Sequence, residues 1–433
     1  MRITASFRVS DIEKFKGNLL NWGQQYEEVV WLDSNGHQDS YHSFDALLAV
    51  DGLTSIQTDS SNAFKDLKEF YGKTNDWLFG YLSYDLKNDV EQLSSQNFDG
   101  LHFPDLYFFQ PKKIIFVQGD RVDFNYLNMV GDDINTDFTA IVHEDFPKSK
   151  GISKAQDIRI KLRIFKNEYF RQVESMLAHI HRGDIYEANF CQEFYAQQTQ
   201  IDVLNTYKKL NAISKAPFAT FLKVKHRYLL SASPERYLKK EGSKVISQPI
   251  KGTARRSQND EADKRLKSDL RKDEKERAEN IMIVDLVRND LSKSALKGSV
   301  SVEELCGVYS FEQVHQMIST VSAEVSEDKN PVEIIQETFP MGSMTGAPKV
   351  SAMQIIEKLE AFKRGLYSGS VGYFSPEGDF DFNVVIRSIL YNETEKYVSY
   401  SVGSAITAKA IPEKEYEECL LKARAMREVL ENI

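Results

Sequence analysis

Cysteine is scarce in this chain. The 433 residues contain three cysteines, Cys191, Cys306 and Cys419, which are widely spaced. So small and odd a number excludes a disulfide framework and does not supply a zinc site, and it is typical of a reducing compartment. None of the three lies in a Gly-flanked turn of the kind that presents a nucleophile, so a built-in glutaminase or thiol protease is not supported.

Long apolar runs are lacking too. No stretch approaches the ~18 apolar residues that a transmembrane helix needs, so no membrane span is expected. The first residues, MRITASFRVSDIEKF, alternate like a strand and lack the apolar segment of a signal peptide. We therefore expect a cytoplasmic protein.

The chain also has no excess of basic residues. Its net charge is −9, and its pI is about 5.6. This balance disfavours nucleic acid and anionic membranes as partners. It still allows a small anionic substrate, because Lys and Arg side chains or a metal ion can reverse the field inside a cleft.

What is present is the composition of a large folded protein, with 41% hydrophobic and 27% charged residues. The pattern divides into an N-terminal region over 1–145 and a larger region over 160–430. The polar stretch 143–156 between them predicts a linker. Strand-like and helical runs do not alternate strictly, which favours a mixed α+β fold over a doubly wound parallel sheet.

Helix signals are clearest in the second region. An apolar stripe from Tyr169 to Ile180 predicts a helix that ends at Gly183. Further helices are expected after Asn330, from Pro348 and from Glu413, and the charged stretch 260–280 continues with helical periodicity into 281–287. The segment 372–382 predicts a hairpin.

One lysine stands out from these elements. Lys251 lies between Ile250 and Gly252 at the end of a strand-like run, sixteen residues after Glu235. If burial lowers the pKa of such a lysine, its neutral amine becomes a usable nucleophile. Glu235, in the turn-like sequence Ser-Pro-Glu-Arg, could act as its acid partner.

Two predicted helices each carry a Glu-x-x-Glu pair. Glu276 and Glu279 share one helix face, and so do Glu415 and Glu418. Both pairs continue into apolar positions, and four converging carboxylates would suit Mg²⁺, which prefers oxygen ligands. From the spacing alone, two solvated charged faces are the more common outcome.

Several other segments could bind an anion. The Gly-rich loop 341–349 leads into a helix start, although a plain tight turn is the better interpretation of this loop alone. The small-residue run 400–406 could bring backbone N–H groups to a carboxylate, or it could be a bulge or a site of close strand packing. Arg387 lies in an apolar run and must find a structural or substrate anion. His315 is more often a hydrogen-bonded core histidine than a catalyst.

In this order and spacing, the segments resemble the chorismate-utilising enzyme family. The match extends over 180–425, with further similarity near 80–85 and 103–106. The pieces that carry it are Ser233–Arg236, Pro249–Thr253, Glu276–Asn280, Ile283–Leu291, Phe339–Lys349 and the final helix with Glu415 and Glu418.

Within that family, the residue at position 251 separates the branches. Aminodeoxychorismate synthases carry Lys at this place, and anthranilate synthases typically carry Ala. The isochorismate and salicylate branch uses a different Lys to activate water, at the place of Glu187 in this chain. Glu187 also departs from the Gln often found there in the amino-transferring members.

The resemblance implies the activity of an aminodeoxychorismate synthase component I in 4-aminobenzoate and folate biosynthesis. Lys251 would add to C2 of chorismate, and Glu235 would protonate the departing 4-hydroxyl. Ammonia would then add at C4 and expel Lys251. Mg²⁺ would be held mainly by Glu279 and Glu418, with Glu276 and Glu415 supporting. The positions implied to hold the substrate are Gly252, Thr253, His315, Tyr367, Arg387, Gly403, Ser404, Ala405 and Lys422.

The resemblance also implies a fold and a partner. The family fold is a sandwich of two antiparallel β-sheets with outer helices in one compact body, its N-terminal region interleaved. A separate glutamine amidotransferase subunit would supply the ammonia. Some members bind tryptophan beside the N-terminal sheet, and 32–34 and 217–219 lie at comparable places, although ordinary packing explains them equally well.

Two alternatives remain open from the sequence. The nearest is anthranilate synthase component I. The other is a catalytically silent ligand sensor with this fold, against which the presence of Glu235, Lys251 and all four metal-site Glu residues argues.

Overall fold

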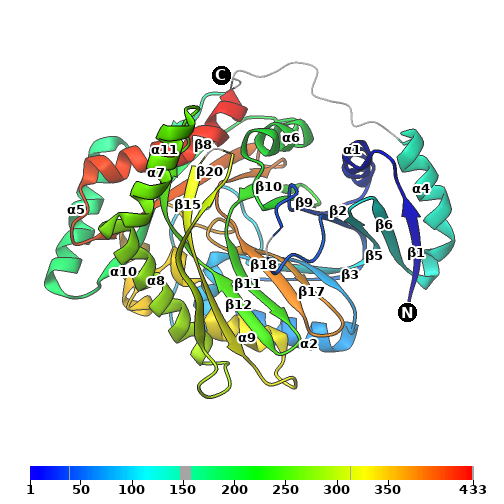
Figure 1. Ribbon diagram of the computed structural model, residues 1–433, viewed down its shortest axis with the longest axis horizontal. Coiled ribbons are helices and arrows are strands. Elements are labelled where there is room, and N and C mark those ends of the chain that lie inside the picture. The colour runs from blue at the N-terminus through cyan, green and yellow to red at the C-terminus, as the bar shows by residue number, and fades with distance from the viewer. Residues whose placement is uncertain (39, 147–157, 313, 432–433) are drawn as a thin grey trace.

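The computed structural model describes residues 1–433 except 39, 147–157, 313 and 432–433 (Figure 1). Its strands are β1 (Arg2–Arg8), β2 (Glu28–Asp33), β3 (Ala46–Thr58), β4 (Leu78–Leu82), β5 (Leu106–Gln118), β6 (Arg121–Leu127), β7 (Lys161–Leu162), β8 (Glu187–Ala196), β9 (Phe218–Val224), β10 (Arg227–Ser233), β11 (Arg236–Glu241), β12 (Lys244–Gln248), β13 (Ile250–Arg255), β14 (Ser301–Ser310), β15 (Val314–Glu324), β16 (Gly346–Ala347), β17 (Ser370–Phe374), β18 (Phe380–Val384), β19 (Ser388–Asn392) and β20 (Tyr397–Thr407).

Helices are distributed along the whole chain. They are α1 (Ile12–Gly23), α2 (Ala63–Thr74), α3 (Lys87–Val90), α4 (Ile134–His143), α5 (Lys166–Arg182), α6 (Val203–Ser214), α7 (Asp260–Lys272), α8 (Glu274–Ser292), α9 (Pro331–Thr338), α10 (Lys349–Leu359) and α11 (Pro412–Glu431), with short 3₁₀ turns η1 (Tyr84–Leu86), η2 (Asn128–Asp133) and η3 (Gly342–Met344).

The strands form two antiparallel layers that share the long strand β5. One layer runs through the pairings β1–β6–β5–β3–β2–β9–β10–β19–β20–β8. The other leaves β5 through β4–β17–β18–β11–β12–β15, and β13 and β14 both pair with β15. The predicted antiparallel α+β sandwich is therefore confirmed, with its two sheets joined through β5 into one hydrogen-bonded network.

Alternating side chains along the strands of the first layer supply two hydrophobic cores. On β2, Val29 and Trp31 belong to the core beneath the outer helices, whereas Val30 faces the core between the layers. On β19, Ile389 belongs to the first core and Leu390 to the second. This period of two is what a strand buried on both faces requires.

The predicted helix boundaries are largely confirmed. Helix α5 ends at Gly183, whose φ of 89° places it in the left-handed region that favours glycine. Helices α9, α10 and α11 begin at or beside the predicted starts. The charged stretch 260–280 differs from a single continuous helix, because it divides into α7 and α8 at Asp273. The Asp273 side chain accepts a hydrogen bond from Glu276 N and caps α8.

The N-terminal region is interleaved with the rest of the chain. Strand β2 pairs with β9, and β4 pairs with β17, so both layers contain strands from 1–145. The boundaries 1–145 and 160–430 remain a prediction. Most of the predicted linker 143–156 lies outside the described residues, and its first residue, His143, ends α4.

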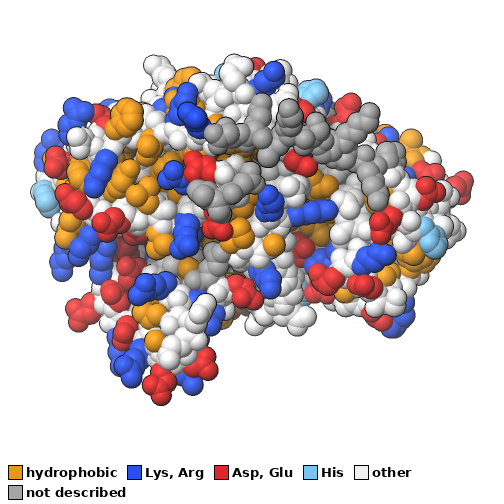
Figure 2. Space-filling view, turned by 90° about the horizontal axis from the view of Figure 1, so that it is seen from above, with side chains coloured by type: hydrophobic (Ala, Val, Ile, Leu, Met, Phe, Trp, Pro, Cys, Tyr) orange, Lys and Arg blue, Asp and Glu red, His pale blue; other side chains and the backbone are white. Residues whose placement is uncertain are grey.

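Acidic and basic side chains are interspersed over the face seen in Figure 2, and hydrophobic side chains gather at its left.

In the part of the chain that the structure describes, no helix is both long and apolar enough to cross a lipid bilayer. The three cysteines are buried and form no disulfide.

Gly80 and Gly72 should respond in opposite ways to substitution by alanine. A Cβ on Gly80, in β4, would lie 1.9 Å from Tyr107 O and 2.7 Å from Phe108 Cα, whereas a Cβ on Gly72, in α2, meets nothing within 4 Å. Gly80→Ala should lower the free energy of unfolding by at least about 1–3 kcal/mol. Gly72→Ala should raise it by ~0.5–1 kcal/mol. Urea unfolding compares both variants with the wild type, and equal midpoints would contradict the close approach at β4.

Candidate active site

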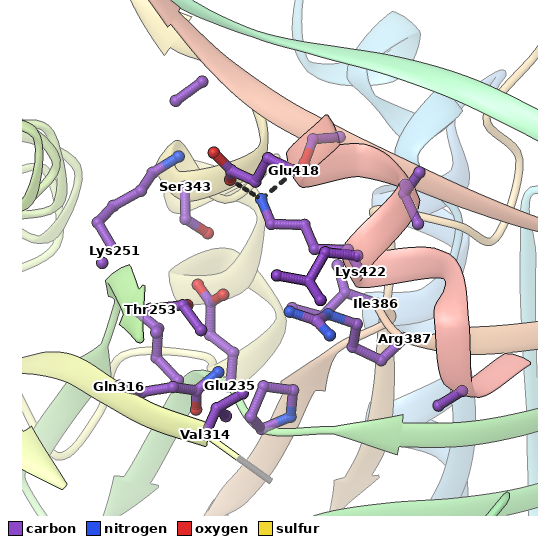
Figure 3. Close-up of a pocket in the computed structure, with 18 of the residues that line it drawn as sticks. Glu235, Lys251, Thr253, Val314, Gln316, Ser343, Ile386, Arg387, Glu418 and Lys422 are labelled. Atoms are coloured by element: carbon purple, nitrogen blue, oxygen red, sulfur yellow. Dashed lines mark hydrogen bonds and ion pairs between the residues drawn. The ribbon is translucent and has the colours of Figure 1, made fainter. Parts of the chain in front are cut away.

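The cavity that brings most of the predicted site residues together has a volume of about 710 Å³. Lys251 reaches it from β13, Glu235 from the turn between β10 and β11, and Lys422 from α11. In Figure 3 these side chains and Arg387 point toward a common space, although they come from distant parts of the sequence.

Lys251 occupies a bulge in β13. The register of β13 against β15 shifts between Ile250 and Thr253, and bulges of this kind redirect side chains. Gly252 has a φ of 95°, and a Cβ there would lie 3.2 Å from Glu276 Oε2, so glycine is required. Asn280 of α8 fixes the bulge, because its Nδ2 donates to Lys251 O at 3.3 Å.

The sequence suggested that Lys251 is a neutral amine, whereas the structure favours the charged ammonium form. Its side chain is 12% exposed, and its Nζ lies 3.5 Å from Glu187 Oε1. Burial alone would lower the pKa of Lys251, but the carboxylates of Glu187, Glu279, Glu235 and Glu418 outweigh that effect and raise its pKa. Lys251 is therefore an ammonium group in this cavity, and it must give up a proton before it can act as a nucleophile.

Glu235 is the buried acid of the cavity. Burial raises the pKa of its carboxyl to about 7, even though a hydrogen bond with Ser343 and the charges of Lys251 and Lys422 act in the opposite direction. Backbone pairing fixes its position, since Glu235 O accepts from Val384 N at 3.0 Å. A carboxyl group with a pKa near neutrality can give up and take back a proton at physiological pH.

Three of the four predicted metal-site carboxylates line the cavity, namely Glu276, Glu279 and Glu418. Glu415 does not line it, and its Oε2 instead accepts a hydrogen bond from Ser404 Oγ. The alternative of solvated charged faces does not apply to Glu279 or Glu415, because both are buried.

Glu279 has a buried carboxylate oxygen that the described residues satisfy only incompletely. Its Oε1 is buried without a hydrogen-bond partner among the described residues, and the Lys275 ammonium lies 3.6 Å away. Burial raises the pKa of Glu279 to about 7, although Lys251 and Lys275 counteract the rise. Lys275 Nζ also lies 3.5 Å from Glu415 Oε1, so this lysine bridges α8 and α11. Within the described residues, no three His, Cys, Asp or Glu side chains lie close enough together to hold a metal ion.

Two of the cations that line the cavity, Lys422 and Arg387, have different environments. Lys422 Nζ donates to Glu418 Oε1 at 2.6 Å and to Gly403 O at 2.8 Å. Arg387 forms no ion pair with a carboxylate among the described residues, and burial lowers its pKa. The structural carboxylate that Arg387 could have found is thus not there, which leaves the cavity as the place for its anion.

The remaining residues that were predicted to hold a substrate divide into two groups. Gly252, Thr253, Tyr367, Gly403 and Ala405 line the cavity. Gly403, on β20, approaches β8 so closely that a Cβ would lie 2.6 Å from Asn189 Oδ1. The predicted anion loop at 400–406 is thus part of a regular, tightly packed strand.

Two predicted positions do not line the cavity. The Ser404 hydroxyl contacts Glu415 instead. His315 is buried between Asp263 Oδ1, 3.0 Å from its Nε2, and Ser310 Oγ, 2.9 Å from its Nδ1. His315 therefore fits the alternative of a hydrogen-bonded core histidine, because its ring is engaged on both sides away from the cavity.

The Gly-rich loop 341–349 contributes to the cavity in an unexpected way. Ser343 and Met344 of η3 line it. Lys349 does not, since its Nζ is 2.6 Å from Asp290 Oδ2 and 2.8 Å from Pro340 O, which makes it a structural clamp. The loop thus fits the preferred interpretation of a tight turn before a helix, and Lys349 forms a buried ion pair with Asp290.

Other lining residues had no sequence signal of their own. Asn189, Gln316 and Arg255 line the cavity together with Ser343. Ser343 could have been found from the motif 339–349 if small polar residues had been considered as partners of Glu235. A second cavity of about 190 Å³ is lined by residues that include 32–34 and 217–219, which were noted in the sequence.

Fold and site together define an α+β protein whose cavity places Lys251 among several carboxylates. The fold is shared with the crystal structure of anthranilate synthase component I from Streptococcus pneumoniae, with a TM-score of 0.77 at 24% identity over 90% of this chain and 94% of that one.

A family model described as "chorismate binding enzyme" matches residues 26–428, and the chain belongs to this family. It is 35% identical over 410 residues to the chloroplastic aminodeoxychorismate synthase of Arabidopsis thaliana, covering 90% of this chain and 44% of that protein. The chain thus spans less than half of that relative. It is also 33% identical to anthranilate synthase component 1 of Thermus thermophilus, covering 84% of this chain and 79% of that protein.

The raised pKa of Glu235 predicts a pH-dependent effect of removing its charge. Because the folded pKa of about 7 lies above the ordinary value of 4.5, the wild type should lose stability as the pH rises through this interval. Glu235→Gln does not titrate there, so its free energy of unfolding relative to the wild type should increase by about 2–3 kcal/mol between pH 4.5 and pH 8.

Urea unfolding at the two pH values measures this change. Glu261→Gln is the control, since that side chain is 85% exposed and its replacement should produce no such trend. A constant difference between Glu235→Gln and the wild type would contradict a raised pKa at Glu235.

Proposed function

We propose that this chain is component I of an aminodeoxychorismate synthase, which converts chorismate and ammonia to 4-amino-4-deoxychorismate in 4-aminobenzoate and folate biosynthesis. The observation that supports this proposal best is the joint presence of Lys251 and Glu235 at one cavity, with the pKa of Glu235 raised to about 7. A nucleophile and a proton donor are the two groups that the substitution of a ring hydroxyl requires. The identity of 35% to a plant aminodeoxychorismate synthase agrees with it.

Chorismate is a dianion, and the cavity offers cations to match it. Arg387 lacks a carboxylate partner among the described residues, and Lys422 reaches the same space from α11. A guanidinium group binds a carboxylate with two parallel hydrogen bonds. In a chain of net charge −9, these local cations allow the cavity to accept an anionic substrate.

The proposed reaction uses Lys251 first as a nucleophile and then as a leaving group. The amine of Lys251 attacks C2, the ring double bonds shift, and the C4–O bond breaks as Glu235 protonates the hydroxyl, which departs as water. Ammonia then attacks C4, the bonds shift back, and the bond between C2 and Lys251 breaks. The ammonium that forms at C4 returns its proton to Glu235, so the acid is restored.

We propose Mg²⁺ as the metal ion because the cavity offers carboxylate oxygens, the ligands that Mg²⁺ prefers. Glu279 and Glu418 would hold the ion with support from Glu276 and Glu415, and these side chains would have to move together to do so, since among the described residues no three of them lie within reach of one ion. The unpartnered buried Oε1 of Glu279 agrees with a need for a cation at this place. When bound, Mg²⁺ would bind the ring carboxylate and stabilise the negative charge that develops during substitution.

Ammonia would come from a glutamine amidotransferase partner. None of the three cysteines lines the cavity, and burial raises the pKa of Cys191, Cys306 and Cys419, so each is a protonated thiol rather than a thiolate nucleophile. A glutaminase step that depends on a reactive cysteine therefore has no candidate among these residues.

A product assay tests the proposed function. Incubation of the chain with chorismate, Mg²⁺ and an ammonium salt should form 4-amino-4-deoxychorismate, identified by liquid chromatography and mass spectrometry. Lys251→Ala should reduce this product by at least ~10²-fold, because the covalent route is lost. Lys244→Ala should leave the rate unchanged. Lys244 is a half-exposed residue of the neighbouring strand β12, and its Nζ pairs with Glu303 at 2.7 Å.

Two outcomes of this assay would contradict the proposal. Formation of anthranilate without 4-amino-4-deoxychorismate would identify the chain as an anthranilate synthase component I. Absence of any chorismate turnover that depends on Mg²⁺ would favour a ligand sensor with this fold.

A further inference from the structure

Glu187 is a buried carboxylate whose second oxygen has no partner. Its side chain is 2% exposed, and its Oε1 lies 3.5 Å from Lys251 Nζ. Its Oε2 is buried and accepts no hydrogen bond from any described residue. Because an incompletely satisfied buried charge is costly, this arrangement requires an explanation beyond packing.

Lys251 and Glu187 form an ion pair with each other. Within the described part of the chain, Glu187 is the carboxylate that approaches Lys251 Nζ within 4 Å. The other carboxylates whose charges reach Lys251 have different contacts. Glu418 pairs with Lys422, Glu279 lies 3.6 Å from Lys275 Nζ, and Glu235 bonds Ser343.

The backbone of Glu187 is held on both sides. It is the first residue of β8, where it pairs with Thr407 of β20 and with Ala347 of β16. A Cβ on Gly346 would lie 2.2 Å from Glu187 O, which shows how closely β16 packs against this residue. A carboxylate on such a rigid support keeps a fixed position relative to its partner.

The chemistry of Lys251 requires a proton acceptor beside its amine. The surrounding carboxylates raise the pKa of Lys251 and keep it protonated, yet only a neutral amine has the lone pair that attacks carbon. Burial raises the pKa of Glu187, although Lys251 opposes the rise. Because both side chains of this ion pair are largely buried, proton transfer replaces two buried charges by two neutral groups, which lowers the desolvation cost.

We propose that Glu187 is the proton acceptor for Lys251 in the amination reaction, a role that rests on the proposed function. One proton moves from Lys251 Nζ to Glu187, and the resulting amine forms its bond to C2 while Glu235 protonates the departing hydroxyl. When ammonia attacks C4, the bond between C2 and Nζ breaks and Lys251 leaves as a neutral amine. Glu187 then returns its proton, and the ion pair is restored.

Glu187→Gln tests this role, because the amide keeps the shape of the carboxylate and cannot accept the proton. The measurement is the rate at which chorismate becomes covalently attached to Lys251 without ammonia, followed by rapid quench and intact-protein mass spectrometry. We expect a decrease of at least ~10²-fold at pH 7.5. Glu187→Asp should recover part of the rate, since it keeps the carboxylate.

The pH profile separates proton transfer from a structural effect. In Glu187→Gln, Lys251 must lose its proton to solvent, so the ratio of the variant's rate to the wild-type rate at the same pH should rise with pH; the ratio removes the loss of the Glu235 proton, which the two proteins share. The charges that still face Lys251 in the variant are those of Glu279, Glu235 and Glu418. A merely structural role would give a rate reduced by the same factor at every pH.

Glu193→Gln is the matched control. Glu193 is also a buried carboxylate on β8, but its Oε2 accepts from Arg163 Nε at 2.9 Å and its Oε1 from the Tyr397 hydroxyl at 2.9 Å, away from the cavity. Its replacement should leave the pH profile of adduct formation unchanged.

Two results would overturn the role of Glu187 in distinguishable ways. If the wild type forms the adduct and Glu187→Gln forms it with the same rate and pH profile, Glu187 is not the acceptor and the proposed function stands. If the wild type forms no adduct on Lys251, the covalent route of the proposed function fails, and the role of Glu187 fails with it.

Discussion

The placement of a lysine ammonium among carboxylates is the constraint on which the rest of the cavity depends. Lys251 is drawn into a cavity where Glu187, Glu235, Glu279 and Glu418 all act on its charge. Without a central cation, buried carboxylates would repel one another and would have to take up protons. Burial raises the pKa values of Glu235 and Glu279 to about 7 even though the charge of Lys251 acts in the opposite direction. Carboxyl groups with pKa values near 7 are suited to proton transfer near neutral pH.

The surrounding fold keeps these groups in place through buried polar contacts. Arg364 is almost completely buried, pairs with Glu360 at 2.6 Å, and donates to Asn189 O and Met344 O at 2.7 Å each. It therefore fixes β8, which carries Glu187, against the η3 turn, whose Ser343 bonds Glu235. A single substitution in such a network leaves buried polar groups without partners and is therefore costly. The network for this reason holds a well-defined geometry.

The sequence predicted the fold and much of the site because the signals were local. Helix caps and the hairpin signal at 372–382 predicted several elements, and the motifs contain Lys251, Glu235, Glu276, Glu279 and Glu418, which the fold brings to one cavity. The direction of the Lys251 pKa shift was not predictable, since it depends on four carboxylates from distant segments. His315 and Ser404 missed the cavity for a related reason, because their partners Asp263 and Glu415 are far away in sequence or on another element. The break between α7 and α8 depended on a single capping side chain, Asp273.

The protonation state of Lys251 in the free protein is the central claim, and competitive acetylation measures it directly. Trace acetic anhydride labels only neutral amines, so the extent of labelling of Lys251 against pH, read by peptide mass spectrometry, gives its pKa. We expect a value above the ~10.4 of an ordinary lysine. A Lys251 that titrates near pH 7 or 8 would be a neutral amine at rest, and it would contradict both the carboxylate-held ammonium and the need for a proton acceptor beside it.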